Sequence, residues 1–121
     1  MERRHELFPI LKQRRRQLAG TLSGGQQQMA AIAIGLMGDP KFCIFDEPSL
    51  GLAPIVIQVI GEALQAPRKL GLTVLPIEQN ARLAETVADR MYIVSAGLIQ
   101  YHSTPQELLR NPEVLEKFVS A

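Results

Sequence analysis

The sequence predicts an α/β fold, and two observations carry that prediction. Segments in which apolar residues recur at helical spacing alternate along the chain with short apolar runs of strand length. The run Phe42–Phe45 is continuously apolar, which is typical of a parallel strand buried on both faces. We therefore expect a mostly parallel sheet, followed by a C-terminal hairpin and helices.

The first third of the chain predicts two helices. Leucines and isoleucines near one side favour a helix over residues 2–17, although Pro9 disturbs its early part. Alanines, isoleucine and methionine at helical spacing predict a second helix over residues 25–38, which Gly38-Asp39-Pro40 ends. A buried strand over residues 42–45 comes next.

The middle of the chain predicts a helix and a second strand. Apolar spacing marks a helix from Val56, closed by Pro67 and Gly71, so that Pro67 cuts it short. Leu72–Ile77 has the composition of a strand, in which Pro76 would remove one donor from the hydrogen-bond ladder.

The last third predicts short elements with clear local signals. Asn80 is the expected N-cap of a helix over residues 81–89. Residues 91–95 and 98–101 flank Ala96-Gly97 as a hairpin, in which Tyr92 and Tyr101 are expected to pack as a pair. Thr104–Glu107 forms a capping box with Pro105 at the first helical position, so a helix is expected to begin there. Asn111-Pro112 breaks that helix, and a final short helix is expected to run to Phe118.

Composition excludes several classes of protein. The 121 residues are 46% apolar and 21% charged, which indicates a globular chain rather than a disordered one. The net charge of +1 argues against a dedicated nucleic-acid binder. Residues 1–20 carry a local charge of +4, which suits a solvated helix face or contact with phosphates or lipid headgroups. The single cysteine, Cys43, makes no internal disulfide and is expected to be buried.

No segment predicts direct membrane insertion. Met1 is followed by charged residues rather than by the apolar stretch of a signal peptide. No run approaches the roughly 18 apolar residues of a membrane-spanning helix. Any work at a membrane would therefore require another chain to hold this one there.

The segment Leu22-Ser23-Gly24-Gly25-Gln26 opens the second helix. Glycines before a helix N-terminus let backbone amides approach a ligand closely, and the helix dipole there favours an anion. Ser23 adds a hydroxyl donor. The segment suits phosphate recognition, and an ordinary Ser-Gly-Gly helix cap is an equally good interpretation of the pentapeptide alone.

Asp46 and Glu47 directly follow the first predicted strand. Residues at the carboxyl end of a parallel strand project into the crevice where α/β sheets bind ligands. Asp46 can hold Mg²⁺, because that ion prefers oxygen ligands, and Glu47 can orient or deprotonate a water that attacks a γ-phosphate. The alternative is an acidic strand end that faces solvent.

The two motifs in this order resemble the ABC ATPase family, whose members carry a signature motif followed by a Walker B strand. Leu22–Gln26 matches the signature, and Phe42–Glu47 matches Walker B with its glutamate. The segments Asp46–Pro54 (DEPSLGLAP) and Ile77–Ala81 (IEQNA) are similar to the ATPase subunits of branched-chain amino-acid importers. The resemblance covers essentially the whole chain.

The resemblance implies a partial P-loop NTPase fold forming one incomplete domain over residues 1–121. Residues 1–38 would be the end of the helical subdomain, and residues 39–121 the C-terminal part of the nucleotide-binding core. It also implies ATP and Mg²⁺ as cofactors, a head-to-tail dimer with a second ATPase subunit, and a membrane permease as partner. The location would be cytoplasmic, on the inner face of the plasma membrane through the permease.

The resemblance assigns roles residue by residue. Ser23, Gly24 and Gly25 would contact the γ-phosphate of ATP held by the partner subunit, and Gln26 would lie near the ribose. Asp46 would serve the metal, and Glu47 hydrolysis, in the chain's own subunit. The family's loop that crosses the dimer interface corresponds to Ser49–Leu52.

Two departures from the family pattern bear on activity. The phosphate-binding pattern G-x-x-x-x-G-K-[ST] is absent, so the chain is expected to start too late to contain it and to be inactive alone. The strands that would flank Phe42–Phe45 are expected to be missing too, which would expose apolar sheet edges. Where many members have a switch histidine, this sequence has Gln79, which donates a hydrogen bond but cannot act as an acid or base.

Three other functions remain as alternatives. The chain could be a non-catalytic module that only dimerises with an intact ATPase subunit. It could be the ATPase head of a DNA-repair or chromosome-organising protein, although no sustained heptads support coiled-coil arms. A nucleic-acid-binding domain built on residues 1–20 lacks aromatic or motif support.

Overall fold

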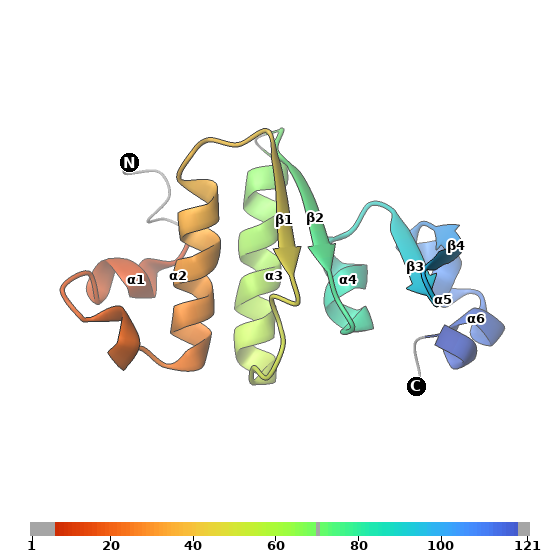
Figure 1. The fold of residues 1–121 in the computed structure, drawn as a ribbon, viewed down its shortest axis with the longest axis horizontal. Coiled ribbons are helices and arrows are strands. Elements are labelled where there is room, and N and C mark those ends of the chain that lie inside the picture. Colours follow the sequence, from red (N-terminus) through yellow and green to blue (C-terminus); the bar gives the residue numbers. More distant parts are fainter. Residues whose placement is uncertain (1–6, 70, 119–121) are drawn as a thin grey trace. The chain divides into compact units, whose positions relative to one another are not determined.

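The computed structural model describes residues 7–69 and 71–118. These residues form two compact units, which meet in the chain between Glu78 and Gln79. Figure 1 shows the elements of both units.

The first unit contains three helices and a parallel pair of strands. Its elements are α1 (Pro9–Gln13), a 3₁₀ turn (Ala19–Thr21), α2 (Gly24–Leu36), β1 (Phe42–Asp46), α3 (Pro54–Lys69) and β2 (Thr73–Ile77). Strands β1 and β2 pair in parallel, from Phe42 opposite Thr73 to Asp46 opposite Ile77, and α3 is the crossover between them. This is a βαβ unit, as the alternation of patterns predicted.

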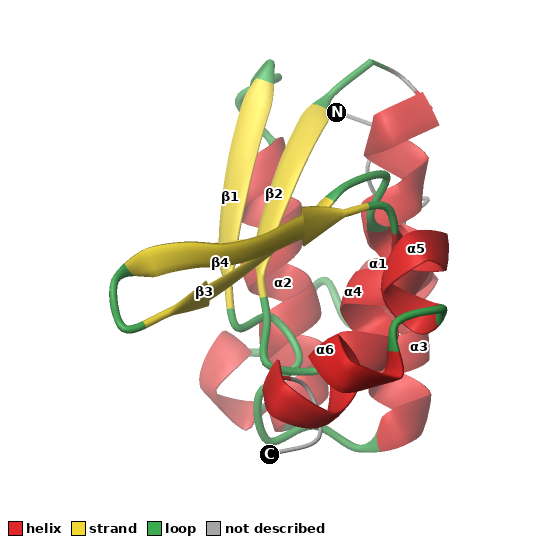
Figure 2. Ribbon diagram, turned by 90° about the vertical axis from the view of Figure 1, so that its right-hand side faces the viewer, coloured by secondary structure: helices red, strands yellow, loops and turns green. Residues whose placement is uncertain are grey.

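Helices α2 and α3 lie together on one side of the strand pair, with α2 packed against β1 and α3 against β2 (Figures 1 and 2). Cys43 and Phe45 point to this side: the Cys43 Sγ lies 3.7 Å from the Gly35 carbonyl oxygen of α2. The described core of the unit combines residues of all these layers: Phe8, Met29, Ile32, Leu36, Cys43, Ile60, Ala63 and Leu64.

The opposite face of the strand pair is exposed. Phe42 and Ile44 keep 52% and 56% of their surface in contact with solvent, and Leu75 and Ile77 keep 43% and 50%. The prediction that Phe42–Phe45 is buried on both faces is therefore wrong for this chain. Successive side chains of a strand point to opposite faces, and the described helices cover only one of them.

The effect of proline differs from the prediction in two helices. Helix α1 is far shorter than residues 2–17, because Pro9 occupies its first turn and Arg14 ends it; residues 2–6 lie outside the described part. Helix α3 continues through Pro67 to Lys69, so Pro67 does not cut it short. Pro67 falls in the last turn, where it removes only one helical hydrogen bond while its ring is buried. Gly71 follows at φ +85°.

Pro76 removes no donor from the β1–β2 ladder, contrary to the prediction. The Thr73 N–H donates to the Lys41 carbonyl, and the Ile77 carbonyl accepts from the Glu47 N–H. The backbone N–H and C=O groups that face β1 therefore belong to every second residue of β2, beginning with Thr73. The backbone nitrogen of Pro76 faces the outer edge, where proline is tolerated.

The second unit contains a helix, a hairpin and two terminal helices. Its elements are α4 (Ala81–Val87), β3 (Met91–Ser95), β4 (Leu98–Ser103), α5 (Pro105–Leu109) and α6 (Pro112–Phe118). Asn80 caps α4 by accepting from the Leu83 N–H at 3.2 Å, as predicted. The capping box at Thr104 is also confirmed, with both of its bonds present at the start of α5.

The hairpin turns at Ala96 and Gly97, both with positive φ, which is the turn that antiparallel strands prefer. An irregularity after Ile93 shifts the register, so Tyr92 lies opposite His102 rather than Tyr101. The Tyr92 and His102 rings stack at 4.4 Å, and Arg90 donates to the His102 Nε2. The predicted Tyr92–Tyr101 pair is therefore wrong.

Candidate functional site

Helix α2 begins at the Ser-Gly-Gly-Gln segment, and its first turn is closed by a capping box. The Gln26 N–H donates to the Ser23 Oγ at 3.4 Å, and the Ser23 N–H donates to the Gln26 Oε1 at 3.1 Å. Ser23 and Gln26 thus fix each other at the helix start. The interpretation as a helix cap is confirmed, and the cap leaves the Ser23 hydroxyl proton as a donor for another group.

The two glycines of this segment have different surroundings. Gly24 is exposed, and a Cβ built on it would meet no atom within 4 Å. Gly25 is buried, and a Cβ built on it would lie 2.7 Å from the Val56 Cγ1 in the first turn of α3. The N–H groups of both residues belong to the first turn and have no partner within the helix, as at every helix start. Gly25 therefore has a packing reason to be glycine.

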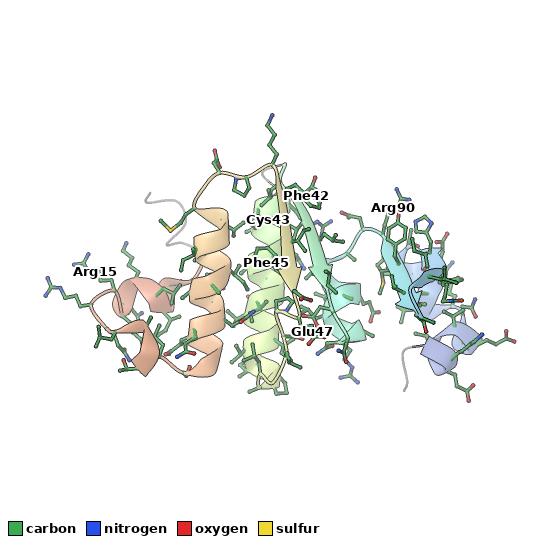
Figure 3. The ribbon with its side chains drawn as sticks, in the orientation of Figure 1. Arg15, Phe42, Cys43, Phe45, Glu47 and Arg90 are labelled. Carbon is green, nitrogen blue, oxygen red and sulfur yellow. The ribbon has the colours of Figure 1, made fainter. Side chains whose placement is uncertain are left out.

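Asp46 and Glu47 lie at the carboxyl end of β1, as predicted (Figure 3). Asp46 is exposed and is the last residue of the strand. Glu47 is half-buried, and its backbone has φ +46°, in the left-handed region that non-glycine residues seldom adopt. Its N–H continues the ladder by donating to the Ile77 carbonyl at 2.8 Å.

The loop after Glu47 is anchored at Ser49. The Ser49 N–H donates to the Glu78 Oε1 at 2.9 Å, and the Ser49 hydroxyl donates to the Glu78 Oε2 at 2.8 Å. Pro48 and Ser49 are buried, whereas Leu50 at the tip of the loop is 70% exposed. Sequence reasoning gave no role to Glu78. Its only signal was a carboxylate directly after an apolar strand.

The two motifs lie at the same end of the first unit. Helix α2 leads into β1 through a short connection and runs in the opposite direction, so that α2 begins at the end of the unit toward which β1 runs (Figure 1). The start of α2 also approaches the first turn of α3 closely at Val56, and α3 begins directly after the loop that carries Glu47. Gln79 is exposed and opens the second unit, directly after Glu78.

The residues present fit a magnesium ion that is held mainly by substrate. In residues 7–69 and 71–118, no three or more histidine, cysteine, aspartate or glutamate side chains form a metal cluster. Mg²⁺ bound with nucleotides usually takes one or two carboxylates, waters and phosphate oxygens. Asp46, an exposed carboxylate at the end of a strand, suits that contribution.

Within the same described residues, no helix is long and apolar enough to cross a bilayer.

Comparison with known proteins agrees with the motifs. The family model described as ABC transporter matches residues 1–50, which contain Leu22–Gln26 and Asp46-Glu47. The chain is 50% identical over 119 residues to the high-affinity branched-chain amino acid transport ATP-binding protein BraG of Pseudomonas aeruginosa. That match covers 98% of this chain and 51% of BraG.

Two solved structures have the same fold. MJ1267, an ATP-binding cassette of an ABC transporter, matches with a TM-score of 0.79 and 29% identity over 95% of this chain and 48% of that chain. The ATP-binding cassette MJ0796, in a dimeric post-hydrolysis state with ADP and phosphate, matches with a TM-score of 0.63 and 25% identity. That match covers 71% of this chain and 37% of MJ0796.

The chain spans about half the length of the relatives it matches. The sequence match, the family model and the fold agree with one another. The chain therefore belongs to the family of ABC transporter ATP-binding proteins.

Proposed function

We propose that the chain is part of an ATP-hydrolysing subunit that energises the import of branched-chain amino acids. The identity with BraG supports the solute class, and the two motifs at one end of the first unit support the reaction. We also propose that residues 1–38 complete a helical subdomain and residues 39–121 belong to the nucleotide-binding core.

The start of α2 would recognise ATP held by a second subunit. The Ser23 hydroxyl and the first-turn N–H groups of Gly24 and Gly25 are donors suited to a γ-phosphate, and the helix dipole adds to their attraction. Gln26 would lie near the ribose. Its Oε1 is engaged with the Ser23 N–H, so its amide Nε2 is the group left to donate.

The end of β1 would serve nucleotide held in the chain's own subunit. Asp46 would hold Mg²⁺, usually through water, and the bound ion would neutralise charge on the phosphates. Glu47 would orient or deprotonate the attacking water. Gln79 would donate a hydrogen bond to the γ-phosphate.

The partners would be a second ATPase subunit and a membrane permease. The exposed tip of the loop Ser49–Leu52, with Leu50 at 70% exposure, suits a contact across a dimer interface. The dimeric structure of MJ0796, which has the same fold, supports pairing with a second subunit, and the pair would be head to tail. The location would then be cytoplasmic and peripheral on the plasma membrane, through the permease.

The observation that carries this proposal is that the Ser-Gly-Gly-Gln helix start and the Asp46-Glu47 pair lie at the same end of the first unit. The test joins the chain to a phosphate-binding half taken from a BraG-like relative and measures Mg²⁺-dependent phosphate release. Glu47→Gln keeps the size of the side chain but removes its charge and basicity, so hydrolysis should fall by at least about 100-fold.

The matched control is Glu62→Gln, which changes an exposed carboxylate of α3 in the same unit. Its activity should equal that of the unchanged chain. Hydrolysis that survives Glu47→Gln at the control level would refute the assigned mechanism. The solute class is tested separately, by whether leucine with its binding protein and permease stimulates hydrolysis more than glutamine does.

A non-catalytic module is the second candidate, in which the exposed start of α2 and the exposed Leu50 would serve only to pair with another subunit. Such a chain would pair with an intact ATPase subunit and complete only one of two nucleotide sites. The chain alone should then bind no ATP but should co-purify with an intact, Glu→Gln-trapped relative in the presence of ATP. Ser23→Arg, which places a bulky side chain at the start of α2, should abolish that capture. Failure to co-purify counts against this candidate.

A further inference from the structure

The loop that carries Glu47 is fixed at two places to the end of β2. At Glu47 itself, the backbone N–H donates to the Ile77 carbonyl at 2.8 Å. Two residues later, the Glu78 carboxylate accepts from the N–H and the hydroxyl of Ser49, at 2.9 and 2.8 Å. Ser49 and Glu78 are 29 positions apart in the chain, so this contact is tertiary rather than local.

Glu47 is the first of these two fixed points, and its backbone has an unusual conformation. Its φ of +46° is in the left-handed region, where the side chain of an L-residue is crowded by its own backbone. The next residue is Pro48, and a residue before proline ordinarily adopts an extended conformation. The tertiary structure must therefore hold Glu47 where it is, because its local preferences do not.

We propose that Glu78 is a positioning residue for Glu47. By accepting from both donors of Ser49, its carboxylate fixes the far side of Pro48 and so keeps Glu47 in the left-handed conformation. That conformation sets the direction in which the Glu47 side chain leaves the end of β1. The proposal rests on the hydrolytic role proposed for Glu47, although the structural link between the two residues stands without it.

The chemistry of the contact allows a matched pair of variants. In Glu78→Gln, the amide oxygen still accepts from the Ser49 N–H, and the amide nitrogen can donate to the Ser49 hydroxyl oxygen. Both hydrogen bonds are therefore kept, and only the one between the two side chains exchanges its donor and acceptor. Glu78→Ala removes both and leaves the donors of Ser49, a residue that is only 6% exposed, without this partner.

The first measurement uses NMR on the 121-residue chain. A strong intraresidue HN–Hα NOE at Glu47 reports positive φ, and amide exchange reports the Ser49 hydrogen bond. Glu78→Gln should retain both signals. Glu78→Ala should lose the NOE and speed exchange at Ser49 by roughly tenfold or more. An unchanged Glu47 conformation in Glu78→Ala would overturn the proposal.

The second measurement uses the chain joined to its phosphate-binding half. Displacing a catalytic group by about 1 Å can cost on the order of 100-fold in rate. Glu78→Ala should therefore lower kcat by about 10- to 100-fold with the KM for ATP nearly unchanged, because Glu78 is not assigned to ATP binding. Glu78→Gln should restore kcat, and Glu62→Ala should leave it unchanged. Equal kcat for Glu78→Ala and the unchanged protein would contradict the proposal.

The two measurements separate this inference from the proposed function. If the joined protein hydrolyses no ATP, the proposed function fails, and the NMR comparison still decides whether Glu78 holds Glu47. If Glu78→Ala does not fold, Ser49→Ala replaces it. This variant removes only the hydroxyl bond, so a smaller shift of the same signals is expected, and no shift would overturn the proposal.

Discussion

Replacing Gly25 with alanine places a methyl group between α2 and α3. The new carbon would lie 2.7 Å from the Val56 Cγ1 and 3.1 Å from its Cγ2, whereas carbon atoms in contact prefer about 3.5–4.0 Å. Valine in a helix has essentially one side-chain rotamer, so it cannot turn both methyl groups away. Relief requires α2 and α3 to separate locally.

The expected cost follows from two opposing effects. Overpacking of this kind costs about 1–3 kcal/mol. Replacing glycine with alanine also stabilises a helix by up to about 1 kcal/mol, because alanine loses less backbone entropy on folding. Gly24→Ala is the matched control, since its methyl group would meet no atom within 4 Å. Gly25→Ala should therefore be less stable than Gly24→Ala by about 1–3 kcal/mol.

Urea unfolding followed by far-ultraviolet circular dichroism measures this difference. Val56→Ala removes both methyl groups that the new side chain would meet. In the double variant, Gly25→Ala should cost less than it does alone, with a coupling of about 1 kcal/mol or more. Equal stability of Gly25→Ala and Gly24→Ala would refute the packing argument and leave ligand access as the reason for glycine at residue 25.

Three further predictions concern helix ends and the hairpin. Ser23→Ala should cost about 1 kcal/mol in urea unfolding, whereas Ser23→Asp should keep the cap but repel phosphate in the ATP-dependent capture assay. The hydrogen bond from the Thr104 N–H holds the pKa of Glu107 below its ordinary value, helped by the Thr104 side chain. The stabilising contribution of Glu107 should be complete above the ordinary glutamate pKa and should disappear as the pH falls through the lowered pKa. Urea unfolding should therefore show the stability difference from Glu107→Gln shrinking as the pH is lowered below the ordinary value. Ala96→Asn should raise the stability of the hairpin by about 0.5–1 kcal/mol in thermal unfolding, because asparagine tolerates the φ of +50° better than alanine does.

Local rules account for the features that the sequence predicted well. The helix cap at Ser23, the capping box at Thr104 and the turn at Ala96-Gly97 each depend on a few adjacent residues, and all three are present in the structure. The strand at Phe42–Phe45 was also found, and the end of α2 was predicted to within two residues, because apolar runs and Gly-Asp-Pro are strong signals. The positions of Asp46 and Glu47 at a strand end followed directly.

The misses depend on contacts between distant residues. An apolar run shows that Phe42 and Ile44 could be buried, but not whether a layer lies over them. The Tyr92–His102 stack follows from a register shift in the hairpin, which the local sequence pattern does not predict. The Ser49–Glu78 contact joins residues 29 positions apart, so only the folded β1–β2 pair reveals it.

The proline at residue 76 makes the two edges of the strand pair chemically unequal. An open strand edge with regularly spaced N–H and C=O groups is a template on which other chains can assemble into fibres. Pro76 interrupts that template on the outer edge of β2, so an incoming strand there forms one bond fewer, a loss of about 0.5–1.5 kcal/mol. The β1 edge has no such interruption between Phe42 and Asp46. Unwanted self-assembly should therefore begin along β1, and a charged side chain introduced there should improve the solubility of the chain.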